Sequence, residues 1–206
     1  MEMTITRALS ELKMLDKRIN RTVDEAVLGG LIIGKHIQHG FQNQEEIEKK
    51  AKADDQSIRA LIKRRNAIKS AIVVSNATTM IDVAGVRMTV AEAIERKTSI
   101  DYDIRYLRKM KQVYKELVDK AEQTNEDVKM RLDQHLETLF GKDGKTQAAA
   151  NQEIVKSFLA ENEAVIIDPL RLRVKIEQLS KEIEDFQMEV DFSLSESNTL
   201  TKIQID

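Results

Sequence analysis

The chain has 206 residues, of which a third are charged and only 4% are aromatic, and its net charge is −2. It contains no cysteine, which excludes disulfides and thiolate chemistry, and its charge gives no general attraction for duplex nucleic acid or anionic membranes. No apolar run approaches the ~20 residues of a membrane-spanning helix, and residues 1–6 lack the features of a signal peptide. We therefore expect a cytoplasmic protein.

A helix and a glycine-rich turn are the first predicted elements. Apolar residues recur at steps of three and four from Thr4 to about Val23, which predicts an amphipathic helix. Gly29 and Gly30 can supply the positive φ angles of a tight turn, so we predict short strands on either side of them. His36 and His39 have no third ligand nearby, and we interpret them as ordinary polar side chains, with no metal site.

A second helix is predicted from Asn43 to about Ser75. Asn43 is the expected N-cap and Glu46 closes a capping box. The second half of this helix carries a basic patch, which is more typical of a solvated face than of a ligand site. The patch consists of Lys63, Arg64, Arg65 and Lys69.

The central segment combines a predicted hairpin, residues 79–88, with a very long helix. Thr89 and Glu92 form a capping-box pattern at the helix start, and about fifty residues follow without Gly or Pro, up to Phe140. At 1.5 Å per residue such a helix is ~70 Å long. A helix of this length is typical of coiled coils and subunit interfaces.

The last third begins with a Gly/Asp turn over residues 141–145 and a short helix over 146–162. Asp168 is the expected cap and Pro169 the first residue of another packing helix with heptad-spaced apolar residues. From residue 188 the apolar residues alternate, with a polar interruption at 195–198, which predicts a terminal β-hairpin.

Together these patterns predict a mainly α fold, with long antiparallel helices or a coiled-coil bundle, short β-hairpins and a homo-oligomeric state, either dimer or tetramer. We expect residues 1–140 to form a helical hairpin core with inserted β-hairpins. We expect residues 141–206 to form C-terminal helices and a terminal β-hairpin that pack on this core.

A candidate anion-binding site lies where the hairpin meets the long helix. A helix start offers free N–H groups and the positive end of the helix dipole, and Arg87 precedes the capping Thr89. Tyr102 and Tyr106 share one helix face, and arginines beside them suit stacking on a base near a phosphate. The same residues also suit an ordinary contact between helices. The candidate ligand-binding residues are Arg87, Thr89, Arg96, Lys97, Tyr102, Arg105, Tyr106 and Arg108.

Catalytic motifs are missing from the sequence. It contains no nucleophile-elbow motif, no His-Glu-x-x-His motif and no pair of carboxylates expected on one buried helix face. We therefore expect no enzyme, no catalytic or metal-binding residues and no cofactor.

One family resemblance rests on the central segment. Residues 76–79, Asn-Ala-Thr-Thr, are followed by Gly85, Thr89, Glu92-Ala93 and Arg96-Lys97. This pattern resembles the central signature of the septicolysin-like family, over about residues 60–121. The resemblance implies a small, mostly helical protein with a hairpin between two long helices.

The whole chain is also similar in style to helical proteins of large phages that infect Gram-positive bacteria. These include sponge proteins that sequester cyclic nucleotide immune signals, such as anti-CBASS proteins. The similarity implies a viral protein of the host cytoplasm that evades anti-phage defence by holding such a signal.

The leading functional hypothesis is thus a non-catalytic protein that sequesters a small phosphorylated signal, such as a cyclic di- or oligonucleotide, between subunits. Its expected partners are further copies of itself and this ligand, without membrane or duplex nucleic acid. The alternative is a coiled-coil structural or assembly protein, virion-associated or a scaffold, that has no ligand.

Overall fold

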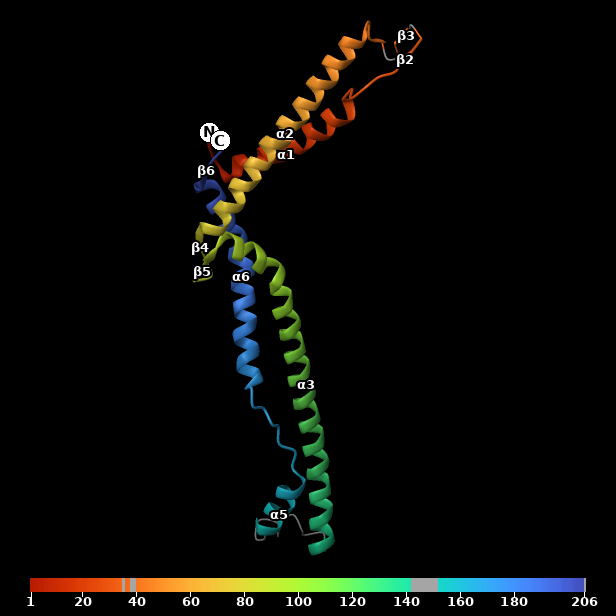
Figure 1. Ribbon diagram of the computed structural model, residues 1–206. Helices are drawn as coiled ribbons and strands as arrows, with labels where there is room; N and C mark the ends of the chain where they lie inside the picture. Colours follow the sequence, from red (N-terminus) through yellow and green to blue (C-terminus); the bar gives the residue numbers. More distant parts are fainter. Residues whose placement is uncertain (35, 38–39, 142–151, 206) are drawn as a thin grey trace. The chain divides into compact units, whose positions relative to one another are not determined.

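The computed structural model describes residues 1–34, 36–37, 40–141 and 152–205 (Figure 1). It is mainly helical with a few short antiparallel strands, as predicted. None of the helices in these ranges has both the length and the apolar run needed to cross a membrane. Coiled-coil pairing and the homo-oligomeric state stay predictions.

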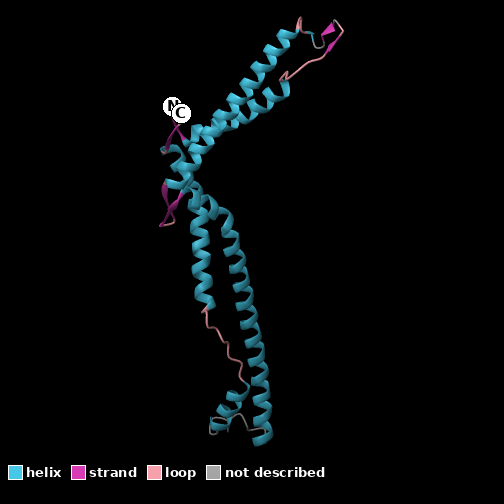
Figure 2. Ribbon diagram, viewed as in Figure 1, coloured by secondary structure: helices cyan, strands magenta, loops and turns pink. Residues whose placement is uncertain are grey.

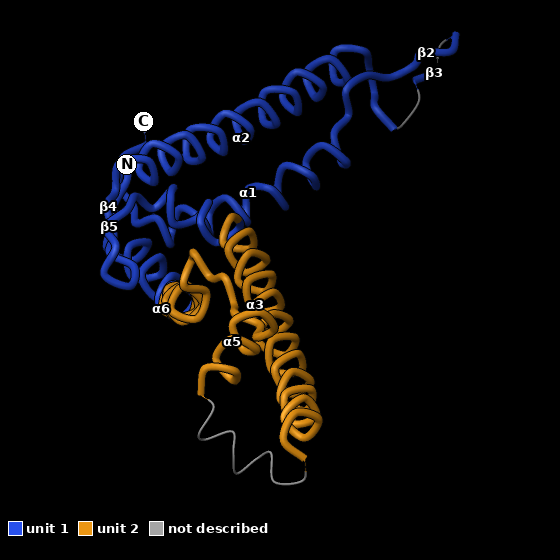
Figure 3. The backbone as a smooth tube through the Cα atoms, turned by 90° about the horizontal axis from the view of Figure 1, so that it is seen from below, with its two compact units in different colours: residues 1–98, 186–206 blue, residues 99–185 orange. Residues whose placement is uncertain are grey.

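The chain divides into two compact units, coloured separately in Figure 3. The first unit contains residues 1–98 and 186–206, and the second contains residues 99–185. The division therefore does not follow the predicted boundary at residue 140. Two helices, α3 (Val90–Phe140) and α6 (Leu172–Leu200), each contribute residues to both units.

The first unit is built on α1 (Ile5–Glu25) and α2 (Gln44–Thr78), which pack along one another (Figure 1). Both predicted starts are confirmed, because Thr4 Oγ1 accepts from the Arg7 amide and Asn43 Oδ1 accepts from the Glu46 amide. The apolar stripes meet in one core cluster, in which Ile68 is fully buried. Burial of these stripes supplies most of the stabilisation of such a helix pair.

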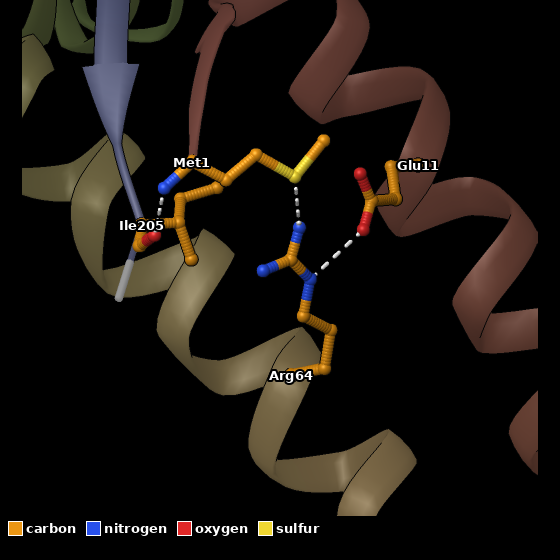
Figure 4. Close-up of polar contacts among 4 residues, drawn as sticks. All are labelled: Met1, Glu11, Arg64 and Ile205. Carbon is orange, nitrogen blue, oxygen red and sulfur yellow. Dashed lines mark hydrogen bonds and ion pairs between the residues drawn. The ribbon is translucent and has the colours of Figure 1, made fainter.

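The basic patch of α2 is partly used inside the first unit. Arg64 Nε lies 3.0 Å from Glu11 Oε1, and Arg65 Nε lies 2.5 Å from Asp16 Oδ1, so both arginines pair with α1. Figure 4 shows Arg64 between the Glu11 carboxylate and the Met1 sulfur. These pairs join α2 to α1 and use two of the four patch residues, while Lys63 and Lys69 stay exposed.

The two ends of the described chain pair as strands. Strand β1 (Glu2–Thr4) runs antiparallel to β6 (Lys202–Gln204), with Met3 opposite Ile203. The Met1 amino group also donates to the Ile205 carbonyl at 2.8 Å (Figure 4). Met3, Ile203 and Ile205 are all buried in the α1–α2 core, so this pairing completes the core of the first unit.

The predicted central hairpin is confirmed, with β4 (Met80–Val83) paired to β5 (Val86–Thr89). Its two-residue turn, Ala84-Gly85, has φ angles of 54° and 75°, as a type I′ turn requires. The Glu189 carboxylate of α6 accepts from the Ala84 amide at 2.7 Å, and Ser193 donates to the Asp82 carbonyl. The hairpin is thereby fastened to α6 within the first unit.

The long helix α3 starts with the predicted capping box. The Glu92 amide donates to Thr89 Oγ1 at 3.1 Å, and Glu92 Oε2 accepts from the Thr89 amide at 2.6 Å and from its hydroxyl. The Thr89 amide, followed by the hydroxyl, stabilises the carboxylate and lowers the pKa of Glu92. The predicted helix end at Phe140 is also confirmed.

A pH dependence follows from this capping box. The folded-state pKa of Glu92 lies below its unfolded value, so its contribution to stability is complete above the unfolded pKa and is lost as the pH falls through the folded pKa. We expect Glu92→Gln to reduce the fall in the urea midpoint between about pH 7 and about pH 3. An unchanged pH dependence in the variant would show that the carboxylate contributes nothing through titration.

The second unit consists of α3 from residue 99 on, α5 (Gln152–Asn162), an irregular segment and the first part of α6 (Figure 2). The side-chain amide of Asn125 in α3 forms two hydrogen bonds with the main chain of Ala164. Its Nδ2 donates to the carbonyl at 3.0 Å, and its Oδ1 accepts from the amide at 2.7 Å. His135 stacks on Phe158 of α5, with 5.6 Å between ring centroids. These contacts hold the returning chain against α3.

The predicted terminal β-hairpin over residues 188–205 is wrong. Helix α6 continues to Leu200, and within the described residues a single short strand, β6, follows it. Val190 is buried whereas Phe192 is 79% exposed, because the buried positions follow a helical stripe through Ile183, Phe186 and Val190. The polar residues 195–198 lie on this helix, where Thr199 Oγ1 donates to the Ser195 carbonyl.

The strands predicted around Gly29 and Gly30 are also placed wrongly. The pair consists of β2 (Ile32–Ile33) and β3 (His36–Ile37), and Gly34, with φ of 62°, lies between them. A Cβ on Gly30 would lie 2.9 Å from the Ile47 side chain, so Gly30 allows a close approach to α2. His39 and the side chain of His36 lie outside the described residues.

The start of α6 differs from the prediction as well. The helix begins at Leu172, three residues after Pro169, which lies in a turn. Asp168 still caps it, because both carboxylate oxygens accept from the Leu172 amide, at 2.8 and 3.0 Å. Arg171, between Asp168 and the helix, has a φ of 54°, in the left-handed region. The predicted turn at 142–145 and the first residues of the helix predicted from 146 lie outside the described ranges.

Candidate functional site

The structure distributes the eight predicted binding residues over both units. Four of them belong to the first unit, namely Arg87, Thr89, Arg96 and Lys97, and four belong to the second, namely Tyr102, Arg105, Tyr106 and Arg108. All except Arg87 and Thr89 lie on α3. The two groups have different surroundings, which decide what each can bind.

The residues of the first unit mostly have partners inside that unit. Lys97 Nζ lies 2.5 Å from Asp191 Oδ1, and the Arg96 guanidinium lies 5.7 Å from the centre of the Phe186 ring. Thr89 belongs to the capping box. Arg87 is exposed and lies opposite Asp82 in the hairpin ladder. A ligand at Thr89, Arg96 or Lys97 would have to displace existing interactions.

Carboxylates of the chain itself also occupy positions where an anion would bind. Glu92 lies at the start of α3 and Glu189 at the amide of the hairpin turn. The Glu92 pKa is lowered, so this carboxylate is charged at neutral pH and would repel a phosphate. The predicted use of the helix start as a phosphate site therefore gains no support from its geometry.

The first turns of α3 in the second unit present a different surface. Tyr102 is 72% exposed and Tyr106 is 45% exposed, and the exposed Arg105 lies about one helical turn after Tyr102. Arg108 is also exposed, but it comes two residues after Tyr106, which places it roughly 160° around the helix from that ring. Within the described ranges, the side chains of Tyr102, Arg105 and Arg108 form no hydrogen bond or ion pair. On the face of the tyrosines, the Tyr102 ring and Arg105 are thus available to a ligand.

The sequence did not identify Lys175 as a neighbour of this surface. This residue of α6 places its Nζ 5.4 Å from the centre of the Tyr106 ring, a cation–π contact. It lies about seventy residues from the tyrosines in the chain, and only the pairing of α3 with α6 within the second unit brings them together. We name the residues Tyr102, Arg105, Tyr106 and Lys175 the aromatic–cationic surface, and Arg108 lies outside it.

A groove further along α3 has the opposite charge. It has a volume of about 660 Å³ and lies between α3 and residues of α5 and the segment after it. Val128, Leu132 and Ile166 contribute to its apolar part, whereas Glu122, Glu126 and Glu163 outnumber the single cation Lys129 on its rim. A phosphorylated ligand is therefore better matched by the aromatic–cationic surface than by this groove.

Comparison of the chain with protein-family models, with curated proteins and with solved structures finds no match.

Proposed function

We propose that the protein is a non-catalytic binding protein that sequesters a small phosphorylated signal, such as a cyclic di- or oligonucleotide, on the aromatic–cationic surface. The proposed active form is a homo-oligomer, a dimer or a tetramer, in which a second subunit covers the ligand. Its proposed place is the cytoplasm of an infected host, where sequestering such a signal would evade anti-phage defence.

The observation that supports this proposal most directly is the exposed Tyr102 with the exposed Arg105 one helical turn further along α3. A tyrosine face can stack on any base. Arginine binds phosphate with two parallel hydrogen bonds. The Lys175 ammonium group, next to the Tyr106 ring, adds a further positive charge and hydrogen-bond donor. The residues of this surface offer no nucleophile–base pair. We therefore propose that the protein binds the nucleotide without converting it.

The first experiment adds a panel of cyclic di- and trinucleotides to the purified protein and follows its melting temperature. We expect at least one nucleotide to raise the melting temperature, and heating should then release that nucleotide chemically intact. Tyr102→Ala should weaken its binding by roughly five- to a hundredfold, the range for loss of one base–aromatic stack.

Arg131→Ala is the matched control, since Arg131 is an exposed arginine on the same helix that lies outside the aromatic–cationic surface. The Arg131→Ala variant should bind the nucleotide with the same affinity as the unmodified protein. No melting shift with any nucleotide, or equal affinities for the Tyr102 and Arg131 variants, would contradict the proposal. Recovery of a cleaved nucleotide would indicate an enzyme.

A second candidate function is that of a coiled-coil assembly protein without a ligand. The observation that favours it is that the hairpin and the start of α3 already carry their own carboxylates. This candidate predicts that Arg87→Ala and Tyr102→Ala alter only oligomer stability. The resemblance to septicolysin-like proteins over residues 60–121 concerns the fold and is compatible with both functions.

A further inference from the structure

We propose that the segment Ala164–Ile167 is a strand edge that pairs antiparallel with the same segment of a second copy of this chain. The segment lies in the second unit between α5 and α6, where Figure 2 draws it as a loop. The inference concerns contacts between protein chains only and does not depend on any nucleotide.

The exposure of the segment follows a two-residue period. Val165 is 77% exposed and Ile167 is 85% exposed, whereas Ala164 is half-buried and Ile166 is 36% exposed. Side chains alternate in this way when the backbone is extended and one face lies against the protein. Two large β-branched side chains, the type most favoured in strands, therefore point to solvent on the same face.

The hydrogen bonds identify which edge of the segment is open. The Asn125 side chain forms hydrogen bonds with both the N–H and the C=O of Ala164. The edge of the segment that carries these two groups therefore faces α3. In an extended chain the main-chain groups of the next residue point to the opposite edge. Val165 and Ile167 accordingly present their N–H and C=O groups away from α3, and they bond to no other described residue.

This open edge is complementary to itself. A two-fold axis at Ile166 places Val165 opposite Ile167 of the second copy, and each such pair exchanges both its N–H···O=C bonds. Two pairs form in this register, with the exposed β-branched side chains as direct cross-strand neighbours. The next position outward is occupied by Pro169, which has no N–H, so the ladder ends there.

Disulfide trapping tests the register, because the chain contains no cysteine of its own. In the proposed pairing residue 166 lies opposite its own copy at a Cα separation of about 4.5 Å, within disulfide range. Ile166→Cys should give mainly cross-linked dimer after mild oxidation. Val165→Cys should give little, because its two copies are offset along the ladder. Equal cross-linking of the two variants, or none in either, would overturn the proposal.

Substitutions that introduce charge pairs test the register independently. Their effect on self-association is measured by light scattering over a range of protein concentrations. V165K/I167K puts like charges opposite one another and should weaken self-association at least about tenfold. V165K/I167E puts opposite charges together in the antiparallel register and should restore it. F192K, at an exposed position of the first unit, should change nothing. Failure of the second variant to recover association, or equal loss in all three, would exclude this pairing.

Discussion

Ile68→Ala is expected to destabilise the first unit by about 2–5 kcal/mol, the usual range for truncating a buried isoleucine to alanine. Ile68 has no exposed surface and lies in the core cluster shared by α1, α2 and the paired strands. Its truncation leaves a cavity between two helices whose contact depends on apolar burial. The change should appear as a lower urea midpoint for the loss of helical circular dichroism.

Ile62→Ala is the matched control, because Ile62 lies on the same helix but is 40% exposed. It removes the same atoms from a partly hydrated site, so its loss should be less than half of that at Ile68. Equal losses would mean that the α1–α2 core does not limit the stability of the first unit.

Phe186→Ala should cost about 3–5 kcal/mol, as expected for a buried phenylalanine. Phe186 is 6% exposed and carries the Arg96 guanidinium over its ring, so the variant loses both apolar burial and the cation–π contact. Phe192→Ala, with the same change at a 79% exposed position of α6, should stay within about 0.5 kcal/mol of the unmodified protein.

Thermal and urea unfolding of both variants provide the comparison. A large loss at Phe192 would indicate that its exposed ring is covered by another chain in solution. A small loss at Phe186 would contradict its burial within the first unit.

Locally encoded features could be predicted well from the sequence. The starts of α2 and α3 depend on a cap and a stripe within a few residues, and Asn43 and Thr89 cap as expected. The start of α1 was predicted from its apolar stripe alone, and Thr4 caps it. The hairpin turn at Ala84-Gly85 is likewise encoded by adjacent residues. Such signals need no knowledge of distant parts of the chain.

The errors arose where a distant partner decides the structure. Residues 202–204 read correctly as extended, but their partner is β1, about two hundred residues away, and not a neighbouring strand. Gly30 is explained by its approach to Ile47, which the local sequence does not reveal. The polar residues 195–198 have the composition of a turn, but they belong to α6, whose buried stripe runs through Ile183, Phe186 and Val190.

The candidate site shows the same limit. Spacing on one helix grouped Arg96 and Lys97 with the tyrosines, but neighbours from α6 pair with those two residues inside the first unit. Lys175 was missed because it becomes a neighbour of Tyr106 only after folding. Which basic residues have partners is a tertiary property, and charge counting along a helix does not predict it.

The discontinuous first unit also constrains how the protein matures on the ribosome. Its core includes Met3 and Ile5 as well as Ile203 and Ile205, so it stays incomplete until nearly the whole described chain has been synthesised. Residues 99–185 form one uninterrupted stretch and can fold while translation continues at about 5–20 residues per second. Helix α2 follows α1 directly and can cover much of its apolar face, but the part of the core that Ile203 and Ile205 cover stays exposed in the nascent chain for several seconds at that rate.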